Sequence, residues 1–338
     1  MRFEPTLKAI PAALGVDVGY SATKVAWLVD GQVVTSSFPS IAERAADSRA
    51  ELELPGLAAQ GSGCLIDVDS VRFFINTTDA VPTHNVSGRT RLDQFCLSRE
   101  YIALVLAAIL QSGLRHLAVL VLGLPCHMRD QLAPELARRF RGTHRIGPDD
   151  IRIDQVMVLP QPVGTYVFMR SENADVFHAG TACCVVDAGW GTVDTFVSDN
   201  TFKVDPNRSG GVPGGAAAVL TAVADLLRHD HPGRHNDLDR IDQCVINRRP
   251  LIHNSQEIDL APYLKRASHV AEQTAARILD RLVTAEDLSV ALAGGASHYF
   301  SAALEALLGR PIPVVARPRF SNAIGFLLAG EAARGHNK

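Results

Sequence analysis

The chain has 338 residues, of which 47% are hydrophobic and 20% are charged, and its formal net charge is −3. This length fits two domains, and the charge excludes a globally basic surface of the kind that binds nucleic acid directly. The apolar run at residues 101–110 is too short to span a bilayer, so we expect no membrane contact. Six cysteines show no CxxC spacing, which predicts reduced thiols and a cytoplasmic protein.

The first predicted elements are three strands within residues 14–38. Residues 14–24 read LGVDVGYSATK, and an apolar run and the turn Asp30-Gly31 follow them. This order predicts a strand, an Asp-x-Gly turn, a second strand, a tight turn and a third strand. Proline and glycine then punctuate residues 39–90, which we expect to form a small, mobile subdomain with one short strand at 71–75.

Predicted helices and strands alternate through the rest of the chain. The predicted helices lie at residues 91–112, 129–139, 163–170, 216–228, 260–283 and 299–308, with a last helix after residue 325. The predicted strands lie at residues 116–122, 151–159, 288–292 and 311–315. The alternation predicts an α/β architecture. Because buried strands end in glycine before a helix, their open ends are expected to meet at one crevice.

One motif occurs twice. Residues 184–194, CVVDAGWGTVD, repeat the pattern of residues 14–24. The matching pairs are Asp17 with Asp187, Gly19 with Gly189, Tyr20 with Trp190 and Lys24 with Asp194. Two copies predict two similar domains that aim their Asp-Gly loops at a shared cleft. We expect domain I to comprise residues 1–162 and 317–338, and domain II residues 163–316.

Both loops have the composition of phosphate-binding turns. Glycine lets the backbone approach a ligand, and successive N–H groups in a turn form a concavity that binds anions. The residues expected to contact phosphate are Gly19, Tyr20, Ser21, Thr23 and Lys24 in the first loop, and Gly189, Gly191 and Thr192 in the second. Asp17 and Asp187 would repel phosphate, so we expect them to hold a hydrated Mg²⁺ ion. The alternatives are an Asx turn at Asp17, a solvated lysine at Lys24, and core packing for Tyr20 and Trp190.

These motifs resemble the nucleotide elements of the actin, sugar-kinase and heat-shock-chaperone ATPase superfamily. The five similar segments are residues 17–24, 160–164, 187–194, 293–297 and 321–326. Within the superfamily, the chain looks most like the ParM/StbA plasmid-segregation actins, because Asp-Val-Gly-Tyr precedes Lys24 and Asn-Ala-Ile-Gly-Phe follows Arg-Pro-Arg-Phe. Trp190 departs from that pattern, since segregation actins usually carry smaller residues there. The resemblance implies two duplicated mixed-sheet domains around a nucleotide cleft.

The resemblance also implies a function and roles for further residues. It implies ATP-dependent assembly into filaments that ATP hydrolysis destabilises, and a DNA-binding adaptor at a plasmid centromere, so that the motor itself need not touch DNA. Asp187 and Asp194 would act with Gln161 in hydrolysis. The other implied nucleotide contacts are Gly294, Gly295 and Ala296 at the ribose and α-phosphate, Gly214 and Gly215 at the adenine pocket, and Asn322.

Gln161 favours hydrolysis over phosphorylation of a small molecule. A neutral amide can orient a water without competing for its proton, whereas a kinase needs a carboxylate base for its substrate hydroxyl. A small-molecule kinase and a non-catalytic nucleotide-switched regulator remain alternatives. In the polar segment 229–240, three histidines lack the companion cysteine pair of a zinc site, which predicts a solvated loop.

Overall fold

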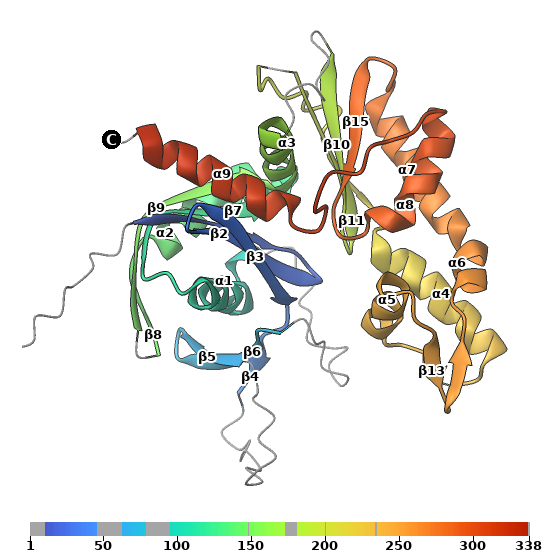
Figure 1. Ribbon diagram of the computed structural model, residues 1–338, viewed down its shortest axis with the longest axis horizontal. Helices are drawn as coiled ribbons and strands as arrows, with labels where there is room; N and C mark the ends of the chain where they lie inside the picture. The colour runs from blue at the N-terminus through green and yellow to red at the C-terminus, as the bar shows by residue number, and fades with distance from the viewer. Residues whose placement is uncertain are drawn as a thin grey trace, which may run out of the picture.

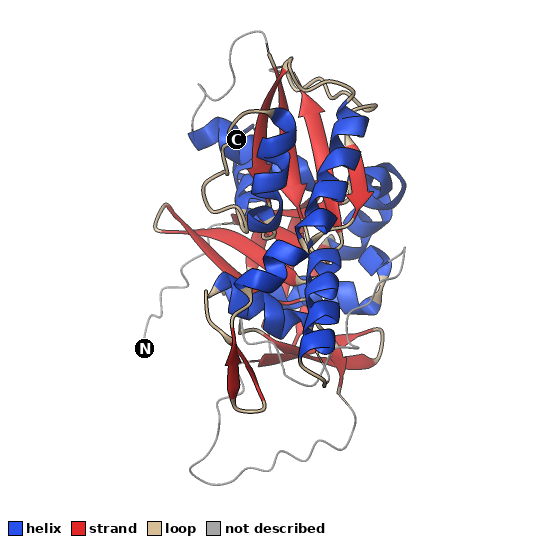
Figure 2. Cartoon of the chain, turned by 90° about the vertical axis from the view of Figure 1, so that its right-hand side faces the viewer, coloured by secondary structure: helices blue, strands red, loops and turns tan. Residues whose placement is uncertain are grey.

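The computed structural model describes residues 11–45, 63–78, 95–147, 149–172, 181–199, 201–233 and 235–336. They form two main sheets with helices packed around them (Figures 1 and 2). The first sheet has the strand order β3-β2-β1-β7-β9-β8, and the second has the order β12-β11-β10-β15. Of the predicted mobile subdomain, only residues 39–45 and 63–78 fall in the described part, and the remainder lies outside the described residues.

Both main sheets mix parallel and antiparallel strands. In the first sheet, the strands are β1 (Ala12–Val18), β2 (Ala22–Val29), β3 (Gln32–Pro39), β7 (His116–Leu124), β8 (Gly142–Ile146) and β9 (Asp149–Pro160). In the second, they are β10 (Ala182–Ala188), β11 (Thr192–Ser198), β12 (Gly210–Pro213) and β15 (Leu288–Ala293). β1 pairs in parallel with β7, and β10 pairs in parallel with β15. The predicted α/β architecture with duplicated mixed sheets is therefore confirmed.

The helices α1 (Arg99–Ser112), α2 (Cys126–Phe140), α3 (Gln161–Glu172) and α9 (Ser321–His336) pack on the first sheet or join it to the second. The helices α4 (Ala216–Asp230), α5 (Leu238–Ile246), α6 (Ala261–Arg266), α7 (Ser268–Leu282) and α8 (Ser297–Leu308) belong with the second sheet. Two small sheets complete the described part. They consist of β4 (Glu43–Arg44), β5 (Gly63–Val68) and β6 (Val71–Asn76), and of β13 (Leu251–His253) with β14 (Gln256–Ile258).

The repeated sequence motif folds the same way twice. In the first copy Asp17 lies opposite Lys24 in the β1–β2 pair, and the Gly19 N–H donates to the carbonyl of Ala22 at 3.1 Å. In the second copy Asp187 lies opposite Asp194 in the β10–β11 pair, and the Gly189 N–H donates to the carbonyl of Thr192 at 2.9 Å. Each aspartate is therefore the last residue but one of the first strand of a hairpin, beside an equivalent turn.

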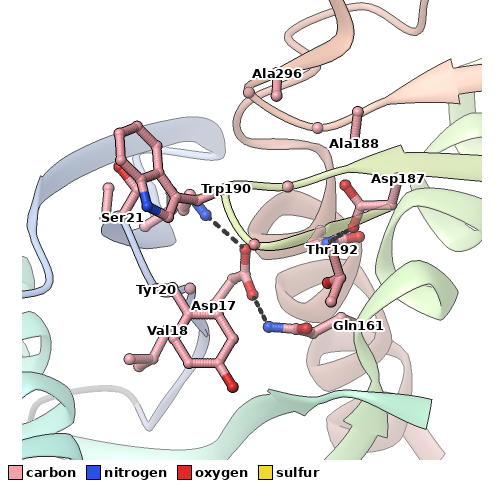
Figure 3. A pocket seen from close by; sticks show the side chains of 18 of the residues that line it. Asp17, Val18, Tyr20, Ser21, Gln161, Asp187, Ala188, Trp190, Thr192 and Ala296 are labelled. Atoms are coloured by element: carbon pink, nitrogen blue, oxygen red, sulfur yellow. Dashed lines mark hydrogen bonds and ion pairs between the residues drawn. The ribbon is translucent and has the colours of Figure 1, made fainter. Parts of the chain in front are cut away.

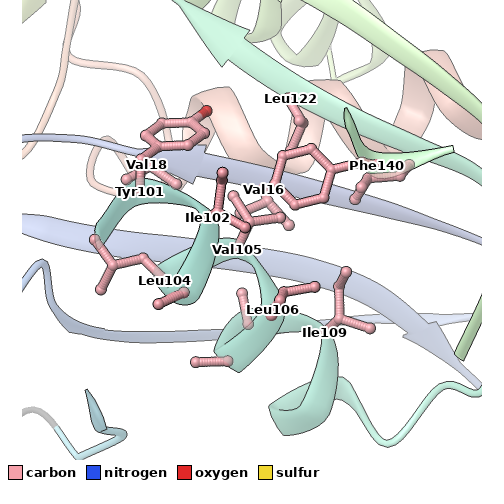
Figure 4. Packing of buried hydrophobic residues seen from close by; sticks show 14 of the residues in the cluster. Val16, Val18, Tyr101, Ile102, Leu104, Val105, Leu106, Ile109, Leu122 and Phe140 are labelled. Atoms are coloured by element: carbon pink, nitrogen blue, oxygen red, sulfur yellow. The ribbon is translucent and has the colours of Figure 1, made fainter. Parts of the chain in front are cut away.

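Helix α1 forms the centre of the first core (Figure 4). The Ser98 hydroxyl accepts the Tyr101 N–H at 3.1 Å and caps the start of the helix, and Gly113, with φ of 73°, ends it. Residues 101–109 are all buried, because the helix lies between the main sheet and the small β4–β6–β5 sheet. A helix that is apolar on every side needs such a cover on both faces.

Helices α3 and α9 cross in direct backbone contact between the two sheets. A Cβ atom on Gly325 would lie 1.7 Å from the Gly164 carbonyl oxygen, and one on Gly164 would lie 2.5 Å from the Asn322 carbonyl oxygen. A Cβ on Gly15 of β1 would lie 2.2 Å from the Ala323 carbonyl oxygen. Only glycine permits this approach. The crossing places the first residues of both helices beside the Asp-Gly loops.

Some elements of the structure differ from the sequence predictions or were not predicted. The helix predicted at 260–283 is broken at the buried Ala267 into α6 and α7, with apolar periodicity continuing on both sides of the break. The segment 311–315 is no strand, since it touches β15 by an isolated bridge at Val314 and its two prolines lack an N–H donor. The hairpin β13–β14 was not predicted. None of the described helices combines the length and hydropathy needed to cross a membrane.

Candidate nucleotide-binding cleft

A cleft opens between the two main sheets, and both Asp-Gly loops face it (Figure 3). Its empty volume is about 1320 Å³, open solvent included, which leaves room for a nucleoside triphosphate. The structure brings most of the sequence-predicted site residues together in its lining. They are Asp17, Gly19, Tyr20, Ser21, Lys24, Gln161, Asp187, Gly189, Gly191, Thr192, Asp194, Gly294, Gly295, Ala296 and Asn322.

Asp17 is the anchored carboxylate of the first loop. Its side chain is nearly buried, and it accepts the Gln161 Nε2–H at Oδ1 over 2.9 Å. At Oδ2 it accepts from Lys24 Nζ, 3.2 Å away on the neighbouring strand. A Cβ on Gly19 would lie 2.9 Å from that ammonium nitrogen, so the glycine leaves room for the lysine. In this arrangement Lys24 neutralises Asp17 at the cleft floor.

Asp187 is the corresponding carboxylate of the second loop, and its environment differs. Asn322 Nδ2 donates to its Oδ2 at 2.7 Å. Burial, and then the nearby charge of Asp17, raise the pKa of Asp187 to about 7, against the lowering effect of the Asn322 hydrogen bond. Gly294, with φ of 88°, packs closely behind it, since a Cβ there would lie 2.4 Å from Asp187 Oδ1.

A hydrogen-bond network between α3 and α9 fixes the Asn322 side chain. Asn322 Oδ1 accepts from the Thr165 N–H at 3.1 Å and from the Thr165 hydroxyl at 2.8 Å. The Thr165 hydroxyl also lies 2.6 Å from that of Ser321. Because the oxygen of the amide is used toward Thr165, the nitrogen must face Asp187. The sequence predicted that Asn322 contacts the nucleotide. The structure shows in addition that Asn322 donates to Asp187, which was predicted to act in hydrolysis.

The two carboxylates are therefore held in the same way. Gln161 is the first residue of α3 and Asn322 the second of α9, and each donates its amide to one aspartate. Because α3 and α9 cross at the Gly164–Gly325 contact, a rotation of one helix against the other would move both amides relative to their carboxylates.

Backbone contacts support the second loop from behind. The Gly214 and Gly215 N–H groups donate to the Gly191 carbonyl at 3.2 and 3.1 Å. A Cβ on Gly215 would lie 2.5 Å from the Gly189 carbonyl oxygen. These two glycines support the phosphate loop, and their contact with adenine stays a prediction. On the cleft side, the Thr192 hydroxyl donates to Asp194 Oδ2 at 2.8 Å.

The structure contradicts the predicted phosphate contact of Thr23. Its side chain is fully buried, and its hydroxyl lies 3.0 Å from that of Ser40. It points away from the cleft because the side chains of a strand alternate between faces, and Lys24, the next residue of β2, takes the cleft side. The Thr23–Ser40 pair joins β2 to the chain after β3.

The sequence missed three groups of lining residues. α5 contributes Asp242, Gln243 and Ile246, the segment before α9 contributes Pro318 and Arg319, and an apolar end of the cleft is lined by Phe95, Cys96, Tyr101 and Met128. The first residues of α5 belong to the polar segment 229–240, whose composition predicted a loop. Tyr20 lines the cleft and stacks on Phe95, with ring centroids 6.0 Å apart.

The histidines of segment 229–240 are engaged with protein groups. His231 Nε2 lies 3.1 Å from the Tyr263 hydroxyl, and His235 Nε2 lies 2.9 Å from the His231 carbonyl oxygen. His235 is 5% exposed, so the prediction of a solvated loop is wrong at that residue. Within the described ranges, no group of three His, Cys, Asp or Glu side chains is placed to enclose a metal ion. Asp17 and Asp187 still fit Mg²⁺, which uses one or two carboxylates and keeps several waters.

Comparison with known proteins identifies the fold. Residues 15–164 match the family described as Actin like proteins N terminal domain. The native structure of Ta0583, an archaeal actin homolog, is 19% identical with a TM-score of 0.75, and the match covers 95% of this chain and 99% of Ta0583. Ta0583 has also been solved in complex with ADP. No curated protein matches the sequence.

Two further solved structures share the fold. ParM of Clostridium botulinum, solved as a 15-stranded filament, is 16% identical with a TM-score of 0.71, and the match covers 95% of this chain and 99% of ParM. Alp7A, an actin-like protein, is 15% identical with a TM-score of 0.72, and the match covers 97% of this chain and 98% of Alp7A. The chain therefore has the two-domain actin-like fold, and proteins of this fold include filament formers.

Proposed function

We propose that the chain is an actin-like ATPase that binds ATP with Mg²⁺, assembles into filaments and segregates plasmid DNA through an adaptor. The observation that carries this proposal is the pairing of two equivalent Asp-Gly loops across one cleft, each aspartate held by an amide from a crossing helix. This arrangement suits a polyphosphate bound between the loops, with both domains contacting the same ligand.

The backbone of the two loops would bind the phosphates. The turns that carry Gly19 and Gly189 line the cleft from opposite sheets and would offer backbone N–H groups to the phosphates, and Ser21 would add a hydroxyl donor. Lys24 would exchange part of its contact with Asp17 for a phosphate oxygen. Gly294, Gly295 and Ala296 would lie along the ribose, and α5 with Arg319 would border the base.

Hydrolysis would depend on the two carboxylates and Gln161. Mg²⁺, held through its waters by Asp17 and Asp187, would neutralise the charge that develops on the phosphates. Gln161 donates its Nε2–H to Asp17, and its Oε1 would accept a hydrogen bond from the attacking water. Asp194, fixed by Thr192, would accept the second hydrogen of that water. The Gln161 amide can orient a water without taking its proton, so slow hydrolysis is the chemistry that these groups support best.

Filament formation and plasmid segregation rest on the relatives. ParM of Clostridium botulinum, which shares the fold, was solved as a filament, and Ta0583 was solved with ADP. A net charge of −3 agrees with a motor that reaches DNA through an adaptor protein instead of binding it directly.

The test combines light scattering with phosphate release after the addition of ATP and Mg²⁺. A dynamic filament predicts a rise in scattering that decays as phosphate appears. Asp187→Ala should assemble with its decay lost, while Asp130→Ala, at an aspartate of α2 whose side chain is 90% exposed, should behave as the wild type. A flat scattering trace at micromolar protein, with nucleotide bound, would contradict the assembly proposal. Turnover that requires a sugar or acid acceptor would instead favour a kinase.

A further inference from the structure

One end of the cleft is apolar, although the phosphate loops beside it carry charged side chains. Several lining residues also belong to the first hydrophobic core or pack against it. They form the apolar recess, which comprises Val18, Tyr20, Phe95, Cys96, Tyr101, Leu124 and Met128. A polyphosphate would lose its hydration against such a wall without new hydrogen bonds. The nucleotide therefore leaves this part of the cleft to a molecule of different chemistry.

The recess contains a polar group that has no partner. The Tyr101 side chain is 1% exposed, and its hydroxyl makes no hydrogen bond to any residue that the structure describes. Figure 4 shows the Tyr101 ring at the start of α1, with the hydroxyl pointing away from the helix. A buried hydroxyl without a partner is costly and rare in native structures. Its presence in the wall of a cleft indicates that a bound molecule supplies the missing partner.

A water molecule fits this position poorly. Apart from its two tyrosine hydroxyls, the recess consists of side chains that end in carbon or sulfur. A buried water needs two to four polar partners, which such a wall does not offer. An apolar molecule with a single acceptor matches the recess better, because its body contacts the carbon surface and its acceptor takes the hydroxyl.

The groups around Tyr101 indicate the charge of the missing partner. Burial raises the pKa of Tyr101 above its usual value, and the ionisable groups of Cys96 and Asp17, which line the cleft, raise it further. The hydroxyl therefore keeps its proton and can donate a hydrogen bond. Because the Asp17 carboxylate acts on this position, an anion is disfavoured there and an uncharged acceptor is favoured.

The recess also adjoins both phosphate loops. The Tyr20 ring belongs to the first loop and stacks on Phe95 with centroids 6.0 Å apart, and Phe95 meets Tyr101 edge-on at 5.6 Å. A Cβ on Gly191 of the second loop would lie 3.7 Å from the Tyr20 ring. A molecule in the recess would therefore contact the aromatic ring that lies between the two loops.

We propose that the apolar recess is a second binding site, which takes a compact, uncharged, apolar molecule with one hydrogen-bond acceptor. The Tyr101 hydroxyl would donate to that acceptor. Met128, whose side chain is flexible, would adapt to the occupant and uncover the hydroxyl. An occupant would hold the Tyr20 ring on Phe95 and exclude water from the phosphate loops, so we expect it to slow hydrolysis. Binding requires neither nucleotide nor assembly, and only the effect on hydrolysis rests on the proposed function.

Titrations of the nucleotide-free protein, followed by ligand-detected NMR, test the site with two probes. Acetophenone carries a carbonyl acceptor on an aromatic ring, and ethylbenzene is the matched probe without the acceptor. We expect Tyr101→Phe to weaken the binding of acetophenone roughly five- to tenfold, because only the hydrogen bond is lost. The same variant should bind ethylbenzene at least as tightly as the wild type does. An equal change for both probes, or no binding of acetophenone at millimolar concentration, would overturn the proposal.

The stability of the ligand-free protein gives an independent readout. Tyr101→Phe should raise the melting temperature, because it removes a buried hydroxyl that has no partner. A lower melting temperature would show that the hydroxyl is satisfied within the folded chain, and would overturn the proposal.

A variant that fills the recess locates the bound probes. Met128→Trp should weaken both probes severalfold, whereas Ile246→Trp, at an apolar residue that lines the cleft from α5, should leave both affinities unchanged. Unchanged affinities in Met128→Trp would place the probes elsewhere and overturn the site.

Phosphate release tests the effect on hydrolysis. Saturating acetophenone should slow phosphate release from the wild type by about fivefold or more, in the range of couplings between neighbouring sites. An unchanged rate with acetophenone bound would overturn this effect. A chain that never hydrolyses a nucleotide would overturn the proposed function, whereas the nucleotide-free titrations would still decide whether the recess binds.

Discussion

Replacing Asp187 by asparagine should make the ligand-free protein more stable at neutral pH. Burial and the nearby charge of Asp17 raise the pKa of Asp187 from 3.8 to about 7 in the folded chain. The folded state therefore binds more protons than the unfolded state between these values, and stability is lost as the pH rises through this window. Asparagine keeps an oxygen for Asn322 Nδ2 and removes the titrating charge.

The size of the effect follows from the shift. About three pKa units correspond to about 4 kcal/mol at 1.36 kcal/mol per unit, and partial exposure of the side chain to the cleft reduces this figure. The loss is complete above pH 7 and only partly developed at pH 5. The advantage of Asp187→Asn over the wild type should therefore grow by up to about 3 kcal/mol between pH 5 and pH 8.

Thermal melting at pH 5 and pH 8, without nucleotide or divalent metal, measures this difference. We expect the melting temperature of Asp187→Asn to exceed that of the wild type by several degrees at pH 8 and by clearly less at pH 5. Asp280→Asn, at an exposed position, should follow the wild type at both values. An equal difference between Asp187→Asn and the wild type at both pH values would refute the account of a destabilised carboxylate.

Two more predictions follow from the crossing helices. Asn322→Leu should slow phosphate release roughly 10–100-fold, as for other residues that hydrogen-bond a metal-ligating carboxylate. Nucleotide affinity should change much less. An equal loss of phosphate release and of nucleotide affinity would instead show that Asn322 contacts the nucleotide directly. Gly325→Ala should lower the free energy of unfolding by about 1–3 kcal/mol or more, because its Cβ would meet the Gly164 carbonyl at 1.7 Å. Its control is Gly335→Ala in the same helix, where nothing lies within 4 Å of the new Cβ and alanine should stabilise by about 0.5–1 kcal/mol. Similar urea midpoints for the two alanine variants would contradict the crossing.

The sequence predicted the parts of the site that local chemistry determines. An Asp-x-Gly turn fixes its own hairpin, so the repeat was enough to place Asp17 opposite Lys24 and Asp187 opposite Asp194. The strands that end in glycine before a helix also predicted the shared crevice, because the carboxyl ends of such strands open at one edge of a sheet. The hairpins β1–β2 and β10–β11 agree with these predictions, whereas β8 and β12 were not predicted.

The parts that depend on distant contacts were not predicted. Asn322 and Asp187 are separated by 135 positions, and their hydrogen bond exists only because α9 returns across α3. The role of Gly214 and Gly215 depends on their docking against Gly191, which local glycine content cannot distinguish from a ligand-binding loop. A helix break such as that at Ala267 leaves the apolar period intact, so periodicity did not detect it.

One substitution between the two copies explains why their carboxylates differ. The first copy places a lysine opposite its aspartate, and the second copy places Asp194 there. Asp17 therefore faces a cation at 3.2 Å, whereas the charges of Asp17 and Asp194 both raise the pKa of Asp187. A cation that bridges the loops would supply Asp187 with the opposite charge that its own hairpin lacks. Because of this asymmetry, the electrostatics of the second loop depend on what the cleft holds.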